Sequence, residues 1–196
     1  MAGYLTSYAG LFSLRDGNAP VVSSVEIPLI QRDYAQGRAD SRVAEIRARF
    51  LDVLYEALAE SEVVGLDFVY GDVEDGTLRL LDGQQRLTTL FLLHWYLGYR
   101  AGQLAERQPW MSFSYATRPS ARLFCQRLVS AAPRPDVADP AAWIVDQSWY
   151  LHVWRHDPTI EAMLVMIGAI HERFARCDVQ RAWERWHDPL RSVRPV

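Results

Sequence analysis

Polar and ionisable residues interrupt an otherwise apolar run between Leu78 and Leu97, and these residues have the types and spacing best suited to chemistry. The interruption reads Asp-Gly-Gln-Gln-Arg-Leu-Thr-Thr over residues 82–89, between a predicted strand and a predicted helix. A glycine turn that opens a helix presents backbone N–H groups to an anion, and the guanidinium of Arg86 offers parallel donors to phosphate. The stretch therefore indicates a phosphate-binding turn.

Each polar residue of this stretch has a candidate role in phosphate binding or hydrolysis. Asp82 is a candidate ligand for Mg²⁺ or for an attacking water, and Gln84 and Gln85 are candidates for positioning that water. The candidate nucleotide-binding residues of the stretch are Gly83, Arg86, Thr88 and Thr89. The alternative is an ordinary helix start, with Asp82 as N-cap, Gly83 as a tight turn and Arg86 as a surface charge.

A second polar cluster, residues 31–38, follows an apolar stretch that is closed by Pro28. Gln31, Arg32 and Tyr34 supply amide, guanidinium and phenol groups on a predicted loop, which is the usual location of binding residues. We expect these three residues to close over the same nucleotide from the side opposite the glycine turn. The alternative is a turn with exposed arginines.

The two motifs together resemble the N-terminal domain family of the GmrSD-type restriction endonucleases. Its hallmarks are an Ile-Pro-x-x-Gln-Arg-x-Tyr element and a later Asp-Gly-Gln-Gln-Arg-Leu-Thr-Thr element, and both are intact here. Two further segments, residues 113–125 and 154–164, are similar to parts of longer members. The resemblance implies an α+β fold, with a small mixed sheet and helices similar to ParB and sulfiredoxin, in which a loop at a helix N-terminus holds nucleotide phosphates.

Characterised members of the family couple such a nucleotide-hydrolysing domain to a separate HNH nuclease domain in defence against foreign or modified DNA. The five histidines of this chain stand in no His-Asn-His setting, so we expect nuclease activity in another domain or subunit, and DNA contact through the full assembly. The cofactors implied are a nucleoside triphosphate and Mg²⁺. Two alternatives stay open: a nucleotide-dependent DNA-binding adaptor or switch without turnover, and a ParB-like nuclease that acts at the same loop.

The order of predicted elements divides the chain into two parts. A proline-rich and aspartate-rich stretch, residues 131–141, is the best linker candidate. It separates a ParB-like nucleotide-binding domain, residues 1–130, from a mainly helical extension, residues 141–196. Tryptophans in the second part occur at helical spacing, which favours a core role over a stacking platform for bases. We expect the chain to be the leading part of a longer protein or one partner of a pair.

Composition excludes several classes of mechanism. All 21 basic residues among the 196 are arginine, which excludes a lysine-based phosphate loop and any lysine nucleophile. A net charge of -3 argues against a basic nucleic-acid-binding module. No stretch reaches the roughly 20 apolar residues that cross a bilayer, and the two cysteines match no metal-ligand spacing. We therefore expect a cytoplasmic protein with reduced thiols and no membrane partner.

Overall fold

The computed structural model describes residues 4–13, 21–28, 33–38, 40–60, 64–187 and 193–195. Its main sheet has the strand order β3-β4-β2-β5. The strands are β2 (Ser24–Ile27), β3 (Tyr70–Glu74), β4 (Thr77–Asp82) and β5 (Phe113–Tyr115). Strand β2 pairs in parallel with both β4 and β5, whereas β3 is antiparallel to β4. This small mixed sheet, surrounded by helices, confirms the predicted α+β fold.

A second, two-stranded sheet pairs β1 (Tyr4–Thr6) with β6 (Val193–Pro195) in antiparallel orientation. The α-helices are α1 (Tyr8–Leu11), α2 (Ser41–Tyr55), α3 (Gln84–Arg100), α4 (Pro119–Val129), α5 (Pro140–Val145), α6 (Pro158–Phe174) and α7 (Val179–Trp186). A π-helical turn, η1 (Glu56–Glu60), continues α2, and two 3-10 turns are η2 (Pro109–Met111) and η3 (His152–His156). No helix in the described part of the chain has the length and apolar character needed to span a membrane.

Most of the helices begin at a residue that caps them. An aspartate is the N-cap of four helices, and in each its carboxylate accepts from first-turn backbone N–H groups: Asp40, Asp139, Asp157 and Asp178. Helices α4, α5 and α6 also start with proline, whose fixed φ suits the first helical turn. These local signals explain where the helices start, and they make the different start of α3 informative.

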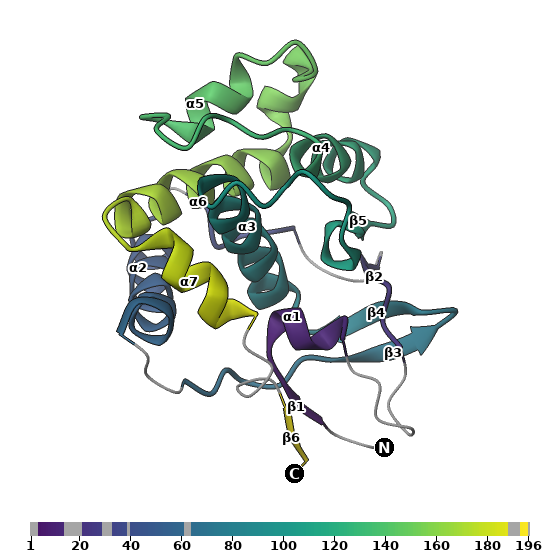
Figure 1. The fold of residues 1–196 in the computed structure, drawn as a ribbon. Helices are drawn as coiled ribbons and strands as arrows, with labels where there is room; N and C mark the ends of the chain where they lie inside the picture. The colour runs from purple at the N-terminus through teal and green to yellow at the C-terminus, as the bar shows by residue number, and fades with distance from the viewer. Residues whose placement is uncertain are drawn as a thin grey trace.

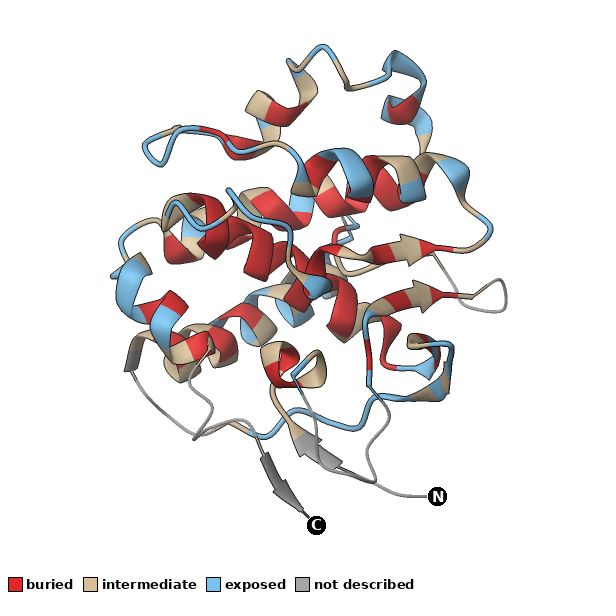
Figure 2. Ribbon diagram, turned by 45° about the vertical axis from the view of Figure 1, so that its right-hand side comes forward, coloured by how far each residue is buried: buried red, intermediate tan, exposed pale blue. Residues whose placement is uncertain are grey.

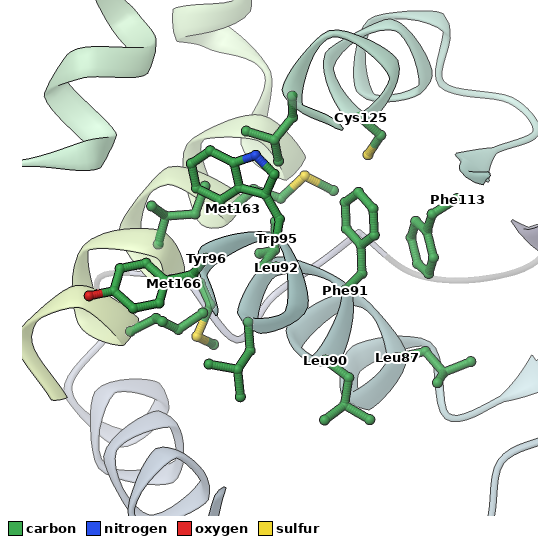
Figure 3. Close-up of a cluster of buried hydrophobic side chains, with 14 of the residues drawn as sticks. Leu87, Leu90, Phe91, Leu92, Trp95, Tyr96, Phe113, Cys125, Met163 and Met166 are labelled. Atoms are coloured by element: carbon green, nitrogen blue, oxygen red, sulfur yellow. The ribbon is translucent and has the colours of Figure 1, made fainter. Parts of the chain in front are cut away.

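Helix α3 is the centre of the core, with α6 and α7 on one side and the sheet on the other (Figure 1). Phe91 of α3 stacks on Phe113 of β5 with ring centroids 4.6 Å apart. On the α6 side, Met163 and Met166 lie against α3 (Figure 3). Both predicted parts of the chain contribute to this one core, and their division into a nucleotide-binding domain and a helical extension stays a prediction. The tryptophans of the second part, such as Trp154, pack into or against the core, as predicted.

His94, in the middle of α3, is buried in a cluster of aromatic rings that joins α1, η2 and α7 to α3. Its ring stacks on Trp110 at 4.2 Å and lies edge-on to Tyr8 at 5.4 Å and to Trp186 at 5.3 Å. Neither imidazole nitrogen has a hydrogen-bond partner among the described residues. Burial lowers the pKa of His94 well below its usual value, and the neighbouring His187 lowers this pKa further. His94 is therefore neutral in the folded protein.

The stability of this cluster should depend on pH through His94. Because the pKa is depressed in the folded state, the unfolded chain binds the proton first, at the ordinary histidine pKa of about 6.5. The stability contributed by neutral His94 is complete above that pH and is lost as the pH falls below it. As the pH falls below this value, the free energy of unfolding should decrease in the wild type more steeply than in His94→Phe. The difference in slope should be up to about 1.4 kcal/mol per pH unit.

Urea unfolding of both proteins between about pH 5 and about pH 7.5 measures this difference. The matched control is His152→Phe, the same substitution at an exposed histidine of η3, outside the aromatic cluster. Parallel profiles for the wild type and His94→Phe would contradict the account.

Candidate functional site

Three parallel strands end at the same edge of the sheet, and each leads into a polar segment. Strand β2 leads towards the loop of residues 33–38, β4 leads into the glycine turn before α3, and β5 leads to residues 116–118 before α4. The carboxyl ends of parallel strands meet at one edge, which is also where open α/β sheets place their ligands. The topology therefore explains why segments far apart in the sequence lie together here.

Gly83 makes the turn from β4 into α3. Its φ of 91° lies in the left-handed region, and a Cβ atom there would lie 3.0 Å from Cγ2 of Val69. Gly83, and not Asp82, is the N-cap of α3, and no side chain of the described residues caps this helix. The positive end of the helix dipole at this turn favours an anion, and Gly83 provides no side chain that could compete with it.

The side-chain amide of Gln85 fixes the loop of residues 33–38 against the first turn of α3. Its oxygen accepts from the backbone N–H of Ala35 at 2.8 Å and of Gln36 at 3.3 Å. Its nitrogen donates to the backbone carbonyl of Asp33 at 3.0 Å. These three hydrogen bonds bring residues 33–36 of the first motif to the start of α3. Gln31 and Arg32 lie outside the described residues, so their place over the nucleotide stays a prediction.

One helical turn further on, Thr89 holds the same loop from within the core. Its hydroxyl lies 2.7 Å from the hydroxyl of Tyr34 and donates to the side-chain oxygen of Gln36 at 2.5 Å. Both Tyr34 and Thr89 are fully buried, and burial raises the pKa of Tyr34, so that its phenol stays neutral. These two candidate nucleotide-binding residues therefore lie beneath the surface of the site.

Gln84 and Thr88 face a different strand, β5. The hydroxyl of Thr88 lies 2.9 Å from the hydroxyl of Tyr115, and Gln84 also hydrogen-bonds the Tyr115 side chain. Gln84 and Thr88 are both buried. Burial raises the pKa of Tyr115 well above its usual value, so its hydroxyl keeps its proton. Residues four apart share one face of a helix, which explains why these two residues reach the same tyrosine.

Arg86 points in a third direction, towards the segment that precedes β3. Its guanidinium donates to the backbone carbonyl of Phe68 and lies 3.5 Å from a carboxylate oxygen of Asp67. Asp82 lies on the same guanidinium at 3.8 Å. Both carboxylates are exposed, whereas the Arg86 side chain is only 24% exposed. The candidate phosphate-binding arginine is thus held in place and partly neutralised by two carboxylates.

Further arginines surround the loop of residues 33–38. The Asp33 carboxylate pairs with Arg118, at the start of α4, and lies 3.9 Å from Arg38. Arg47 of α2 donates to the backbone carbonyl of Gln36 at 2.9 Å. Sequence reasoning missed Arg118, as it missed Tyr115, because neither position carries a local signal beyond its place in the segment 113–125.

The candidate metal ligand Asp82 has few possible co-ligands. Among the described residues no group of three histidine, cysteine, aspartate or glutamate side chains is placed to hold a metal ion. Asp67 approaches the same guanidinium as Asp82 and is the nearest second carboxylate that the contacts identify. A divalent cation here would need oxygen ligands from a bound phosphate or from water as well.

Removal of the Gln85 amide should loosen the loop of residues 33–38 selectively. In Gln85→Leu, two backbone N–H groups lose their acceptor, and each such loss costs about 1–3 kcal/mol when the group stays buried. We expect lower stability towards urea and faster amide hydrogen exchange at Ala35 and Gln36. The control is Gln103→Leu, at an exposed glutamine just after α3. Unchanged exchange at both amides in Gln85→Leu would show that the side chain does not hold the loop.

Comparison with known proteins agrees with the motifs and with this geometry. The family model described as GmrSD restriction endonuclease, N-terminal domain, matches residues 9–179, which include the glycine turn, the loop of residues 33–38 and Tyr115. No curated protein and no solved structure gives a significant match, so the likeness to ParB and sulfiredoxin stays an expectation. Since the match covers most of the chain, the chain belongs to the family of GmrSD restriction endonuclease N-terminal domains.

Proposed function

We propose that the chain binds a nucleoside triphosphate with Mg²⁺ at the start of α3 and hydrolyses it, as the nucleotide-dependent domain of a system that restricts foreign or modified DNA. Membership of the family makes the chain a component of a restriction system. The observation that carries the finer proposal is the edge where three parallel strands bring polar segments to an uncapped helix N-terminus. This is the location at which sheets of this kind bind ligands.

Phosphate binding is assigned to the backbone at Gly83 and the first turn of α3, together with Arg86. Gly83 turns the chain with a positive φ that places the first turn of α3 at the sheet edge, and its lack of a side chain leaves that turn without an N-cap side chain. Arg86 adds a charged donor that its contacts with Phe68 and Asp67 already orient. An oriented side chain loses less freedom when a ligand binds.

The carboxylates of Asp67 and Asp82 fit a magnesium ion that accompanies the nucleotide. Both converge on Arg86, both are exposed, and oxygen is the donor that Mg²⁺ prefers. When bound, Mg²⁺ would neutralise charge between these carboxylates and the phosphate oxygens. Without a cation, two carboxylates beside the turn would repel a triphosphate, and we therefore expect binding to depend on Mg²⁺.

We assign positioning roles to the polar residues of the two motifs that have partners inside the protein. The sequence predicts that Gln84 and Gln85 position an attacking water, but both side chains have partners inside the protein. Together with Thr88, they set the geometry of the site; Gln84 and Thr88 are buried and Gln85 is half-buried. Asp82 is then the candidate that orients the water, and nucleotide binding by Gln31 and Arg32 stays a prediction from the sequence.

A nucleotide-dependent adaptor that binds without turnover is the second candidate function. It is favoured by the internal contacts of the two glutamines, since Asp82 is then the main candidate for activating a water at the turn. Nuclease activity is assigned to an HNH domain or subunit, and DNA contact to the full assembly. A ParB-like nuclease at the same loop is disfavoured because the carboxylates beside the turn would repel DNA phosphates.

Arg86→Ala should weaken binding of a nucleoside triphosphate in the presence of Mg²⁺ by about tenfold or more, because a charge-assisted hydrogen bond contributes about 1.5–3 kcal/mol. Isothermal titration calorimetry with ATP and GTP measures the affinity, and circular dichroism checks folding. The matched control is Arg79→Ala, an arginine of β4 that also pairs with two carboxylates but lies away from the turn. If Arg86→Ala is folded and its nucleotide affinity is unchanged within about threefold, Arg86 does not bind the phosphates.

Asp82→Ala separates hydrolysis from binding. If Asp82 orients water or holds the cation, phosphate release should fall much more than nucleotide affinity does. Wild-type binding without any phosphate release would establish the adaptor function instead. Metal-dependent nicking of plasmid by the purified wild type, abolished in Asp82→Ala, would favour the nuclease.

A further inference from the structure

A strip of large apolar side chains lies in solvent beside the glycine turn. We call Leu66, Phe68, Val69, Tyr70 and Leu81 the apolar strip; they make up half of the large apolar side chains that are exposed in the described part of the chain. Phe68 is 90% exposed, and every residue from 65 to 70 is exposed (Figure 2). Single exposed apolar residues are ordinary on protein surfaces, but a contiguous group of them marks an interaction site.

The backbone that carries the apolar strip is held in place. The carbonyl of Phe68 accepts from Arg86, and the neighbouring Asp67 pairs with the same guanidinium. Val69 packs closely against Gly83, and Tyr70 pairs with Asp82 at the end of the β3–β4 ladder. The apolar strip is therefore exposed on a backbone that contacts with α3 and β4 hold in place.

Leu81 lies on the exposed face of β4, where buried and exposed residues alternate from Leu78 to Leu81. The register between β3 and β4 shifts between Tyr70 and Gly71, close to this residue. Leu81 is 48% exposed, whereas the preceding Leu80 is fully buried. Leu81 directly precedes Asp82, the residue that pairs with Tyr70, and the strip thus extends across two strands.

The apolar strip continues into β3, which is an edge strand of the main sheet. Strand β3 is the terminal strand in the order β3-β4-β2-β5, so one side of it pairs with no strand in the described part of the chain. An unpaired edge can accept an additional extended strand, whose backbone forms hydrogen bonds and whose alternate side chains meet the surface beside the edge. The edge and the apolar strip together fit an extended segment.

Charge decides which kind of segment fits. Residues 64–82 contain five carboxylates and one arginine, a net charge of -4, whereas the whole chain has -3. The carboxylates are Asp67, Asp72, Glu74, Asp75 and Asp82. A second copy that paired through β3 would bring these acidic groups against one another, and nucleic acid would be repelled. A segment with basic residues is attracted instead.

We propose that the apolar strip and the β3 edge dock an extended segment of another protein, in which apolar side chains alternate with lysine or arginine. Such a segment would contact Phe68 and Val69, which touch Arg86 and Gly83, so its binding would bear directly on the start of α3. The proposal stands on the exposed strip, the free edge and the local charge, and it does not depend on nucleotide binding.

A short fluorescein-labelled peptide that alternates valine or phenylalanine with lysine or arginine tests the proposal. Fluorescence anisotropy should show binding to the full chain, and amide chemical-shift changes should fall on residues 66–82. Two control peptides, one with glutamate for the basic residues and one with serine for the apolar residues, should bind at least about tenfold more weakly.

The matched variants are Phe68→Ser and Val153→Ser, since both side chains are exposed but Val153 lies on η3. Phe68→Ser should weaken binding of the basic peptide by about tenfold or more, and Val153→Ser should leave it unchanged. The proposal fails if the peptide does not bind, if either control peptide binds equally well, or if the shifts lie elsewhere. Self-association of the wild type that Phe68→Ser abolishes would assign the strip to a second copy instead.

Discussion

The site depends on the side-chain amide of Gln85, which joins the first turn of α3 to the loop of residues 33–38. One amide satisfies two backbone N–H groups and one carbonyl of a loop that has no regular secondary structure of its own. Unpaired, these groups would carry the cost of buried polar atoms. The loop is thus ordered by a residue about fifty positions away, and the site exists only when α3 and β2 are both in place.

Polar side chains in the first two turns of α3 hold three other segments of the chain in the same way. Gln85 and Thr89 hold the loop of residues 33–38, Gln84 and Thr88 hold Tyr115 of β5, and Arg86 holds the segment before β3. All five side chains form contacts within the protein, and a stable site follows from them. What remains for a ligand is the start of the helix after Gly83 and the charged surface formed by Arg86 and its two carboxylates.

Much of this arrangement could be predicted from the sequence, because it rests on local patterns. The strand, glycine turn and apolar helix around residues 82–89 follow from periodicity and from the properties of glycine, and parallel strands explain why both motifs meet at one edge. The inward orientation of Gln84, Gln85 and Thr88 could not be predicted. Amides and hydroxyls that suit a ligand suit a buried backbone equally well, and only tertiary packing decides between them.

Contacts between residues that are distant in the sequence could not be predicted either. Asp67 and Phe68 hold Arg86 from a segment that reads as an ordinary strand, and Tyr115 carries no sign that it faces two residues of the motif. The aromatic surroundings of His94 depend in the same way on helices from both ends of the chain. Such contacts are determined by the topology of the fold, which the local patterns of a single sequence do not reveal.

The central claim is that the uncapped start of α3 binds the phosphates of a nucleotide. The most direct test is a titration of ¹⁵N-labelled chain with a non-hydrolysable nucleoside triphosphate and Mg²⁺, followed by amide chemical shifts. The account predicts the largest changes at Gly83, Gln84, Gln85 and Arg86, with smaller changes in the loop of residues 33–36. Saturable changes confined to another part of the chain, with those four amides unmoved, would contradict it.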